Sequence, residues 1–241
     1  MADDPPVPVD RLIHLVSAVF ALVFTLVVAS LIGELVSTLA LRAGIVGEET
    51  NGAEILGTVA TFGSFLPAVI GYLAITDQWD LVPVSNPTLR AAGVVPIAAI
   101  GLYAIQIGLL LVLREFGLQT GQNPATTAAG DPVAYYLAMI AVSILVVGPA
   151  EELLFRGAIQ GGLRRSFGAA PAILVASVLF GLLHAGVDGT LAEQLAYISV
   201  AAILGVLLGV LYERTENILV PALAHGLYNA IIFTTLLWRV L

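Results

Sequence analysis

Seven long apolar segments limit what this 241-residue chain can fold into more than any other feature of its sequence. A helix needs about 20 mostly apolar residues to cross the hydrocarbon core of a bilayer, and most of the segments reach that length. The segments cover residues 12–41, 53–75, 89–113, 133–162, 171–187, 191–212 and 218–240. Because 59% of the residues are hydrophobic and 11% are charged, one soluble core could not bury all of the apolar surface. The sequence therefore predicts an all-α, polytopic transmembrane helix bundle.

The connections between these segments are polar, and none of them resembles a linker to a second domain. The longest, Gly117–Pro132, contains the glycine and proline residues typical of turns. We therefore expect residues 1–241 to form a single integral membrane domain. The first and fourth segments exceed the length that a bilayer requires, so we expect them to tilt, kink or protrude. Pro149 lies inside the fourth segment, where a kink is tolerated if neighbouring helices satisfy the freed backbone groups.

The cysteine and charge content exclude several classes of site and partner. The chain has no cysteine, which rules out disulfides, thiolate metal sites and a cysteine nucleophile. Its net charge is −8 and its nine basic residues are all arginines, a haloarchaeal-like composition that suits a high-salt cytoplasm. We expect no nucleic-acid partner, because no basic patch is present to neutralise phosphates. The start, MADDPPVPVDR, lacks the positive region of a secretory signal, so we expect the first apolar segment to remain as a membrane helix.

The distribution of arginines between the two ends of the predicted bundle indicates its orientation. With seven spans, the N-terminus and the second, fourth and sixth connections lie on the same side of the membrane. That side carries Arg11, Arg90, Arg164, Arg165 and Arg214, whereas the other side carries Arg42, Arg114 and Arg239. Positive side chains favour the cytoplasmic side, so we predict a multi-pass protein of the cell membrane with a cytoplasmic N-terminus.

Ionisable side chains at membrane depth are costly and by default indicate a functional site. The fourth segment carries Glu151 and Glu152, the fifth carries His184, and the seventh carries His225 with Asn229. These groups fall on three separate segments, so a bundle is needed to bring them together.

Helical spacing separates the two glutamates. Glu152 and Arg156 are four residues apart on one helix face, so we expect them to pair. Glu151 lies about 100° around the helix from Glu152 and faces elsewhere. At about 1.5 Å per residue, Glu151 and His184 each lie roughly 20 Å from the arginine-rich turn that joins their helices. We therefore expect packing to collect these groups around one cavity that opens toward the cytoplasmic, arginine-rich side.

Two kinds of chemistry fit these residue types. A carboxylate can act as the general base that activates water, while histidine and asparagine donate hydrogen bonds to the charge that develops on a carbonyl oxygen. Alternatively, Glu151, His184 and His225 can hold zinc or another divalent ion with an open position for water. A structural interpretation also stays open, since a Glu–Arg pair often acts as a latch and a lone membrane histidine often hydrogen-bonds a backbone carbonyl.

Three short motifs, in this order, resemble those of the CPBP family of intramembrane proteases (Abi family), which includes the type 2 CAAX prenyl endopeptidase. EELLFR (Glu151–Arg156) matches the family's EExxxR motif, FGLLH (Phe180–His184) its FxxxH motif, and HGLYN (His225–Asn229) its HxxxN motif. The resemblance covers about residues 133–235, whereas the helices expected over 12–113 vary widely in the family.

The resemblance implies an intramembrane endopeptidase that acts on a prenylated CAAX-type protein or another membrane-embedded peptide, with or without a divalent metal. The roles it implies are a general base for Glu151, a water ligand for His184, oxyanion donors for His225 and Asn229, an orienting pair for Glu152 and Arg156, and a packing residue for Phe180. Two other functions fit the same residues. One is a non-catalytic scaffold or immunity-type protein that retains the fold, and the other is a proton-coupled transporter.

Overall fold

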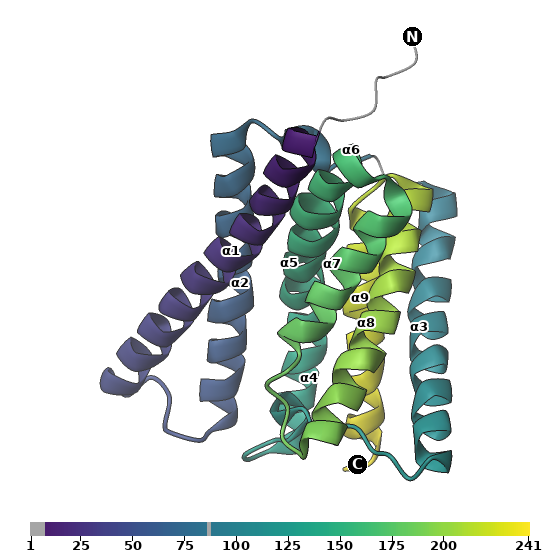
Figure 1. Ribbon diagram of the computed structural model, residues 1–241. Coiled ribbons are helices and arrows are strands. Elements are labelled where there is room, and N and C mark those ends of the chain that lie inside the picture. The colour runs from purple at the N-terminus through teal and green to yellow at the C-terminus, as the bar shows by residue number, and fades with distance from the viewer. Residues whose placement is uncertain (1–7, 86–87) are drawn as a thin grey trace.

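The computed structural model describes residues 8–85 and 88–241, and within these ranges the chain is a helical bundle (Figure 1). The predicted all-α class is confirmed, because the one β-type pairing among the described residues is an isolated bridge between Gln122 and Asp188. The helices are α1 (Pro8–Arg42), α2 (Asn51–Thr76), α3 (Leu89–Glu115), α4 (Pro132–Val142), α5 (Gly148–Glu152), α6 (Gly162–Phe167), α7 (Ala169–Leu183), α8 (Leu191–Thr215) and α9 (Leu219–Trp238). Two 3-10 helices, η1 (Trp79–Leu81) and η2 (Pro124–Thr126), lie in connections.

Six of the described helices are long and apolar enough to cross a membrane, which confirms a polytopic protein. They correspond to six of the seven predicted segments, and the fourth segment forms one continuous helix over Pro132–Phe167. The predicted fifth segment, residues 171–187, is shorter in the structure because α7 ends at Leu183. His184 is its C-cap, and the chain then turns through Gly189, whose φ of 139° is accessible mainly to glycine.

Four helices begin at side chains that accept hydrogen bonds from the free N–H groups of the first turn. These caps are Thr50 for α2, Thr88 for α3, Asp131 for α4 and Thr190 for α8. At α8 the side chain of Glu193 also accepts from the backbone of Thr190, which completes a capping box. The connections therefore start these helices at defined residues, which fixes the register of the groups that they carry into the bundle.

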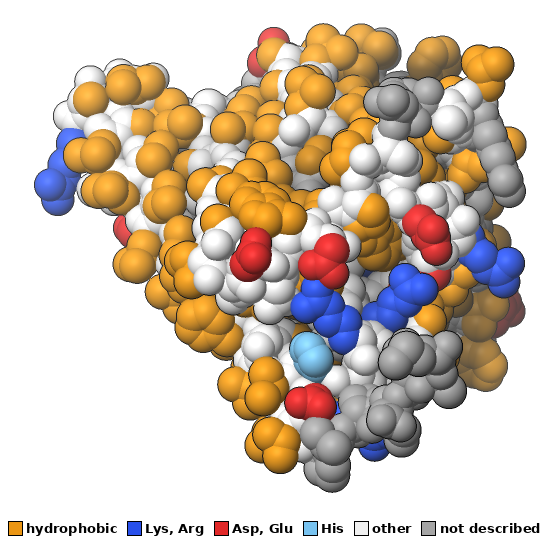
Figure 2. All heavy atoms as spheres, turned by 90° about the horizontal axis from the view of Figure 1, so that it is seen from above, with side chains coloured by type: hydrophobic (Ala, Val, Ile, Leu, Met, Phe, Trp, Pro, Cys, Tyr) orange, Lys and Arg blue, Asp and Glu red, His pale blue; other side chains and the backbone are white. Residues whose placement is uncertain are grey.

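The motif-bearing helix, which runs from α4 to α6, lies between the other helices of the bundle (Figure 1). It contacts α1 and α2 on one side and α7 and α9 on the other. The pair α1 and α2 forms one edge of the bundle, α3 forms the opposite edge beside α9, and α7 packs against α8. The start of α1 and α6 lie at one end of the bundle, and the start of α4 lies at the other. Arginine and acidic side chains lie close together on the end where α1 begins (Figure 2).

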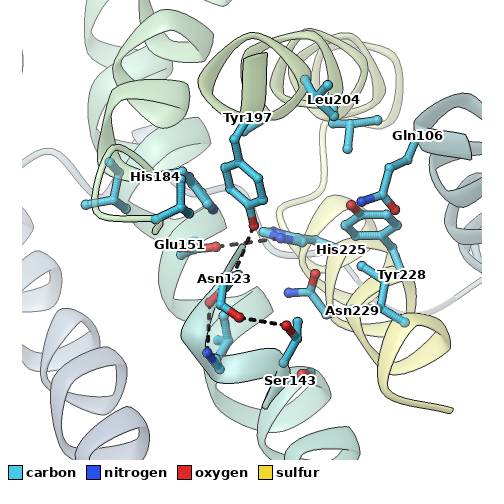
Figure 3. Close-up of a pocket in the computed structure, with 18 of the residues that line it drawn as sticks. Gln106, Asn123, Ser143, Glu151, His184, Tyr197, Leu204, His225, Tyr228 and Asn229 are labelled. Atoms are coloured by element: carbon cyan, nitrogen blue, oxygen red, sulfur yellow. Dashed lines mark hydrogen bonds and ion pairs between the residues drawn. The ribbon is translucent and has the colours of Figure 1, made fainter. Parts of the chain in front are cut away.

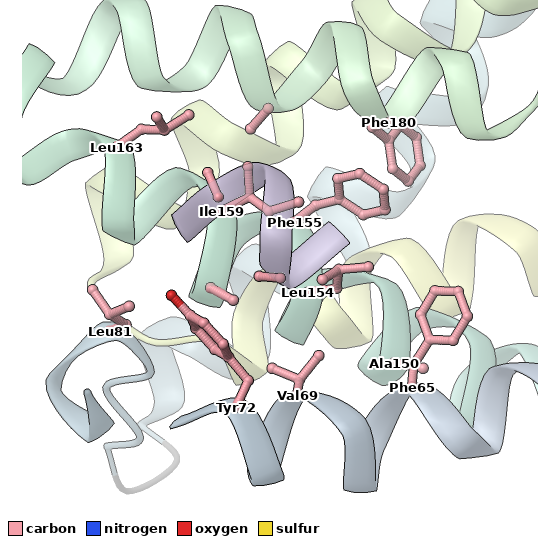
Figure 4. Packing of buried hydrophobic residues seen from close by; sticks show 14 of the residues in the cluster. Phe65, Val69, Tyr72, Leu81, Ala150, Leu154, Phe155, Ile159, Leu163 and Phe180 are labelled. Carbon is pink, nitrogen blue, oxygen red and sulfur yellow. The ribbon is translucent and has the colours of Figure 1, made fainter. Parts of the chain in front are cut away.

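A buried apolar cluster holds the motif-bearing helix against α1, α2 and α7 (Figure 4). Phe65 and Val69 of α2 meet Leu154 and Phe155 of the motif-bearing helix, and Phe180 joins them from α7. Each of these side chains is almost fully buried. In water, burial of such side chains stabilises a fold by roughly 1.5–3 kcal/mol each. In lipid, van der Waals contacts between closely packed side chains stabilise the association of the helices instead.

Two π-helical segments flank the short α5 segment that carries Glu151 and Glu152. They are η3 (Ser143–Val147) and η4 (Leu153–Gly161). A π-helix has i→i+5 hydrogen bonds, is rare, and is often found at functional sites. Pro149 has no N–H to donate to the preceding turn, which accounts for irregular hydrogen bonding on its N-terminal side. The irregularity expected at Pro149 thus takes the form of widened turns.

Glycines allow the motif-bearing helix to approach α9 until their backbones touch. A Cβ atom on Gly148 would lie 2.6 Å from the carbonyl oxygen of Ala222. A Cβ atom on Gly226 would lie 2.7 Å from the Cα atom of Ile144. Neither position has room for a methyl group, because the neighbouring atoms belong to the backbone. Gly226 directly follows His225, so this contact sets the distance between His225 and the motif-bearing helix.

We expect Gly226→Ala to lower the free energy of unfolding by about 1–3 kcal/mol, because the added methyl group overlaps the backbone of the motif-bearing helix. Gly101→Ala in α3 is the matched control, since nothing lies within 4 Å of the added Cβ atom. At position 101, the helix propensity of alanine is more favourable than that of glycine by about 1 kcal/mol. Unfolding midpoints of both purified variants in detergent measure the difference, and equal stability of the two would contradict the close contact.

Candidate active site

The imidazole ring of His225 lies between the carboxylates of Glu151 and Glu152. Its Nδ1 atom is 2.9 Å from Oε1 of Glu152, and its Nε2 atom is 3.6 Å from Oε2 of Glu151 (Figure 3). All three side chains are at most 5% exposed. The prediction that Glu151 faces a group from another helix is confirmed by this contact. The two glutamates nevertheless share one partner, because the ring of His225 is wide enough to reach both.

Glu152 also forms the predicted ion pair with Arg156. The Nε atom of Arg156 is 2.9 Å from Oε2 of Glu152, and both side chains are 0% exposed. The guanidinium carbon lies 5.0 Å from the centre of the Phe180 ring, a cation–π contact. The Phe180 ring is also 5.7 Å from the ring of His225 and 4.8 Å from that of His184. Phe180 therefore packs against the site from α7.

His184 reaches the site from the C-terminal end of α7. Its Nδ1 atom is 2.9 Å from the carbonyl oxygen of Phe180. A carbonyl oxygen can only accept, so Nδ1 carries the hydrogen, and in the neutral ring the lone pair of Nε2 is free. A purely structural histidine can make the same contact with a backbone carbonyl. His184 differs because its ring also lines the cavity, where its Nε2 atom is available for a further hydrogen bond.

A cavity of about 490 Å³ brings the predicted site residues together. Its walls include Glu151, His184, His225 and Asn229, and the latter two lie one turn apart on α9 (Figure 3). The apolar part of the remaining wall comes mainly from α2, α3, α7, α8 and α9. The arrangement can therefore place a base, a histidine nitrogen and an amide around one reacting group.

The cavity reaches the end of the bundle opposite the arginine-rich side toward which we expected it to open. Residues 120–126 of the α3–α4 connection and residues 186–187 of the α7–α8 connection form part of its wall. These connections lie at the opposite end of α7 from Arg164 and Arg165. The helix lengths gave the correct depth for Glu151 and His184, but they could not show that the α3–α4 connection folds inward.

Two polar residues of the cavity wall, Asn123 and Tyr197, were not predicted. Asn123 belongs to the α3–α4 connection and Tyr197 to α8, and the amide Nδ2 of Asn123 donates to the hydroxyl of Tyr197 over 3.2 Å (Figure 3). The sequence signal for Asn123 was its place before Pro124, where it caps η2. Nothing in the spacing of Tyr197 separates it from the other aromatic residues of an apolar helix.

The arrangement does not fit a three-ligand metal centre. Within residues 8–85 and 88–241, no three His, Asp or Glu side chains converge closely enough to hold an ion. The Nδ1 atoms of His184 and His225 contact Phe180 and Glu152, respectively, so the ring nitrogen that each could offer to an ion is Nε2; these Nε2 atoms and the Glu151 carboxylate do not form such a group. We therefore derive no step through a metal ion held by Glu151, His184 and His225.

Comparisons with known proteins point to one family. Residues 133–231 match the family described as type II CAAX prenyl endopeptidase Rce1-like. Over 111 residues the chain is 32% identical to "Putative membrane peptidase YdiL" of Bacillus subtilis (strain 168), a match that covers 46% of this chain and 42% of the relative. Over 87 residues it is 37% identical to "Uncharacterized protein YpbD" of the same organism, covering 36% of this chain and 40% of the relative.

The alignment with each of these relatives spans less than half of the relative's length. No solved structure matches the chain. The segment matched by the family begins in α4, ends in α9, and contains Glu151, His184, His225 and Asn229. Over residues 133–231, the chain is therefore similar to the Rce1-like family of type II CAAX prenyl endopeptidases.

Proposed function

We propose that this protein is an intramembrane endopeptidase in which Glu151 activates the attacking water. The observation that carries the proposal is the buried Glu151–His225–Glu152–Arg156 assembly, which borders a cavity that also contains His184 and Asn229. Four ionisable groups at membrane depth would be costly to a merely structural bundle. The similarity of residues 133–231 to the Rce1-like family supports the same reaction class.

In the proposed first step, Glu151 accepts a proton from water while the water oxygen attacks the carbonyl carbon of the substrate. His184 orients this water: its Nδ1 hydrogen is used by Phe180, so the lone pair of Nε2 accepts the second hydrogen of the water. The attack converts the planar carbonyl into a tetrahedral intermediate with a negative charge on oxygen.

The negative oxygen then requires donors, which Asn229 and His225 supply. His225 donates to Glu152 through Nδ1, so it donates to the substrate from Nε2 only when both ring nitrogens carry a hydrogen. A His225 ring with both hydrogens carries a positive charge. Together with the positive charge of Arg156, it balances the negative charges of Glu151 and Glu152. As the carbon–nitrogen bond breaks, the proton held by Glu151 passes to the leaving amine, and the carboxyl product forms.

The cavity wall suggests the class of substrate. Apolar side chains such as Phe62, Leu102, Leu110 and Leu204 surround most of it, while Gln122 and its neighbours in the α3–α4 connection provide a polar end. We propose that it takes a membrane-embedded peptide segment or the prenylated C-terminus of a CAAX-type protein. Apolar walls can hold the lipid-like part of either, and polar groups can hold the peptide backbone.

The side of the membrane from which the substrate comes depends on the orientation of the bundle. The arginine distribution favours a cytoplasmic N-terminus. With that orientation, the α3–α4 connection and the polar end of the cavity face away from the cytoplasm. We therefore propose that peptides anchored in the outer leaflet are the better substrates, whereas a cytoplasmic prenylated protein requires the opposite orientation.

We expect Glu151→Gln to lower kcat by about 10²–10⁴, because the amide cannot accept the proton of water. The assay is cleavage of a prenylated CAAX peptide and of a panel of transmembrane peptides, read by mass spectrometry. Glu34→Gln is the matched control, since Glu34 is an exposed glutamate of α1 whose side chain accepts a hydrogen bond from Thr38. We expect it to leave kcat unchanged.

Chelation of divalent ions is the second arm of this experiment. The glutamate mechanism predicts full activity after chelation, whereas activity that is lost and then restored by zinc would support the metal alternative. A protein that cleaves none of the substrates, combined with a Glu151→Gln variant that keeps the cellular phenotype, would instead support a non-catalytic scaffold.

We expect Arg156→Met to lower the free energy of unfolding by about 3–5 kcal/mol, because it leaves the buried carboxylate of Glu152 without its counter-charge. The double variant Glu152→Gln/Arg156→Met is expected to recover part of the loss. Arg164→Met is the control: its side chain is 50% exposed and pairs with Glu213, so the loss stays within about 1 kcal/mol. Unfolding midpoints in detergent measure all three, and equal effects of the two arginine substitutions would contradict the buried pair.

The proposed orientation predicts the accessibility of single cysteines, which can be introduced cleanly because the chain has none. We expect Gln119→Cys, in the α3–α4 connection, to react with a membrane-impermeant maleimide in intact cells. Ala170→Cys, near the turn between α6 and α7, is expected to react only after the membrane is made permeable. Both positions are exposed in the structure, so unequal burial does not explain a difference. The reverse pattern would place the cavity on the cytoplasmic side.

A further inference from the structure

The α3–α4 connection is fastened across the end of the cavity by backbone hydrogen bonds. The N–H of Gly121 donates to the carbonyl oxygen of Glu193 over 3.0 Å. Gln122 and Asp188 exchange two backbone hydrogen bonds of 2.8 and 3.0 Å. The connection is thus tied to the start of α8 and to the α7–α8 connection directly before Asn123. It therefore has a defined path where it meets the site.

Two tyrosines of α4 hold the connection on the other side of Asn123. The hydroxyl of Tyr135 donates to the carbonyl oxygen of Ala125 over 2.9 Å, and that of Tyr136 donates to the carbonyl oxygen of Thr126 over 3.2 Å. Both tyrosines are buried. Asn123 is therefore fixed from both directions along the chain, and its side chain is directed at Tyr197.

The direction of the hydrogen bond between Asn123 and Tyr197 leaves the tyrosine hydrogen free. The Oδ1 atom of Asn123 accepts from the backbone N–H of Ala125 over 3.0 Å, which determines the orientation of the amide. Its Nδ2 group must then face Tyr197, and an amide nitrogen can only donate. The oxygen of Tyr197 is the acceptor, so its own O–H can donate to another group.

That free O–H lies at the reacting centre. Tyr197 lines the same cavity as Glu151, and its ring centre is 6.0 Å from that of His184. In Figure 3 its hydroxyl is directed toward the space between Glu151 and His225. Among the described residues, Asn123 is the one group that forms a hydrogen bond with this hydroxyl. A phenol that keeps a donor hydrogen beside a general base is placed to bind a substrate oxygen.

We propose that Tyr197 is a further catalytic residue, whose O–H donates to the carbonyl oxygen of the scissile peptide bond, and that Asn123 is the residue that positions it. This inference rests on the proposed endopeptidase function. It supplies a donor that does not depend on the protonation of His225. As the carbonyl oxygen gains negative charge, the hydrogen bond from Tyr197 strengthens, and this lowers the barrier to attack by water.

The test compares kcat and KM of Tyr197→Phe with those of the unmodified protein. We expect kcat to fall by about 10²–10³, the loss typical of one oxyanion donor, while KM changes much less. Tyr103→Phe is the matched control, because it removes a phenol hydroxyl that contacts Thr235 over 3.2 Å outside the cavity wall. It is expected to retain full activity.

Asn123→Ala tests the positioning role. We expect a smaller loss of kcat than for Tyr197→Phe, because the hydroxyl remains but is no longer held. The double variant Asn123→Ala/Tyr197→Phe is expected to match Tyr197→Phe alone, since Asn123 acts only through that hydroxyl. A further loss in the double variant would overturn the positioning role.

The outcomes separate this inference from the proposed function. If Tyr197→Phe keeps kcat within about twofold while Glu151→Gln loses it, the role of Tyr197 is overturned and the endopeptidase stands. If Glu151→Gln also remains active, or the unmodified protein cleaves nothing, both are overturned. Should Tyr197→Phe fail to fold, a difluorotyrosine at position 197 keeps the ring and hydroxyl but is more acidic. This change in the strength of the donor is then expected to alter kcat much more than KM, and an unaltered kcat would overturn the role.

Discussion

The buried contact of Glu152 with both Arg156 and His225 is the interaction on which the rest of the structure depends. A carboxylate and a guanidinium removed from water lose several kcal/mol of solvation each, and only close, hydrogen-bonded pairing offsets that loss. Glu152 meets this condition in two ways: Oε1 is hydrogen-bonded to His225, and Oε2 forms an ion pair with Arg156, whose guanidinium also packs over the ring of Phe180. It thereby joins two turns of its own helix to α9. The pair is thus both a charge balance and a connection between helices.

The backbone adapts to this contact in two ways. Gly148 and Gly226 bring the motif-bearing helix and α9 to a separation at which a single methyl group would not fit. The π-helical turns η3 and η4 add residues on either side of α5, so the adjacent glutamates are presented by an irregular stretch rather than by a regular helix. Together these features allow one imidazole ring to touch two neighbouring carboxylates. Irregular backbone at membrane depth is tolerated here because i→i+5 hydrogen bonds still pair its backbone groups and most of η4 is buried within the bundle.

Features that depend on local sequence were predictable. The spans follow from hydropathy, and the pairing of Glu152 with Arg156 follows from the helical repeat. The position of His225 between both glutamates was not predictable, because it depends on how far α9 is displaced along the motif-bearing helix. That displacement is set by tertiary contacts such as the hydrogen bond from the N–H of Ile218 to the carbonyl oxygen of Pro83.

The wall of the cavity was the least predictable part of the site. Asn123 reaches it through a connection whose path is fixed by pairing with Asp188 and Glu193, residues that lie far away in the sequence. No periodicity describes such a path. For this reason the cavity reaches the end of the bundle opposite the one that we expected, although the depths of Glu151 and His184 followed correctly from helix length.

The cavity also has a consequence for the shape of the substrate. Its wall includes Thr58 and Phe62 of α2 and Gln106 and Leu110 of α3, and these two helices lie at opposite edges of the bundle. The space therefore extends sideways across the bundle as well as toward the end that the α3–α4 connection covers. A transmembrane helix that enters it has its carbonyl oxygens already hydrogen-bonded to its own N–H groups, so none is free for attack. Such a substrate must unwind locally before hydrolysis, and residues that weaken a helix, such as glycine or proline, near the cleaved bond make that unwinding easier.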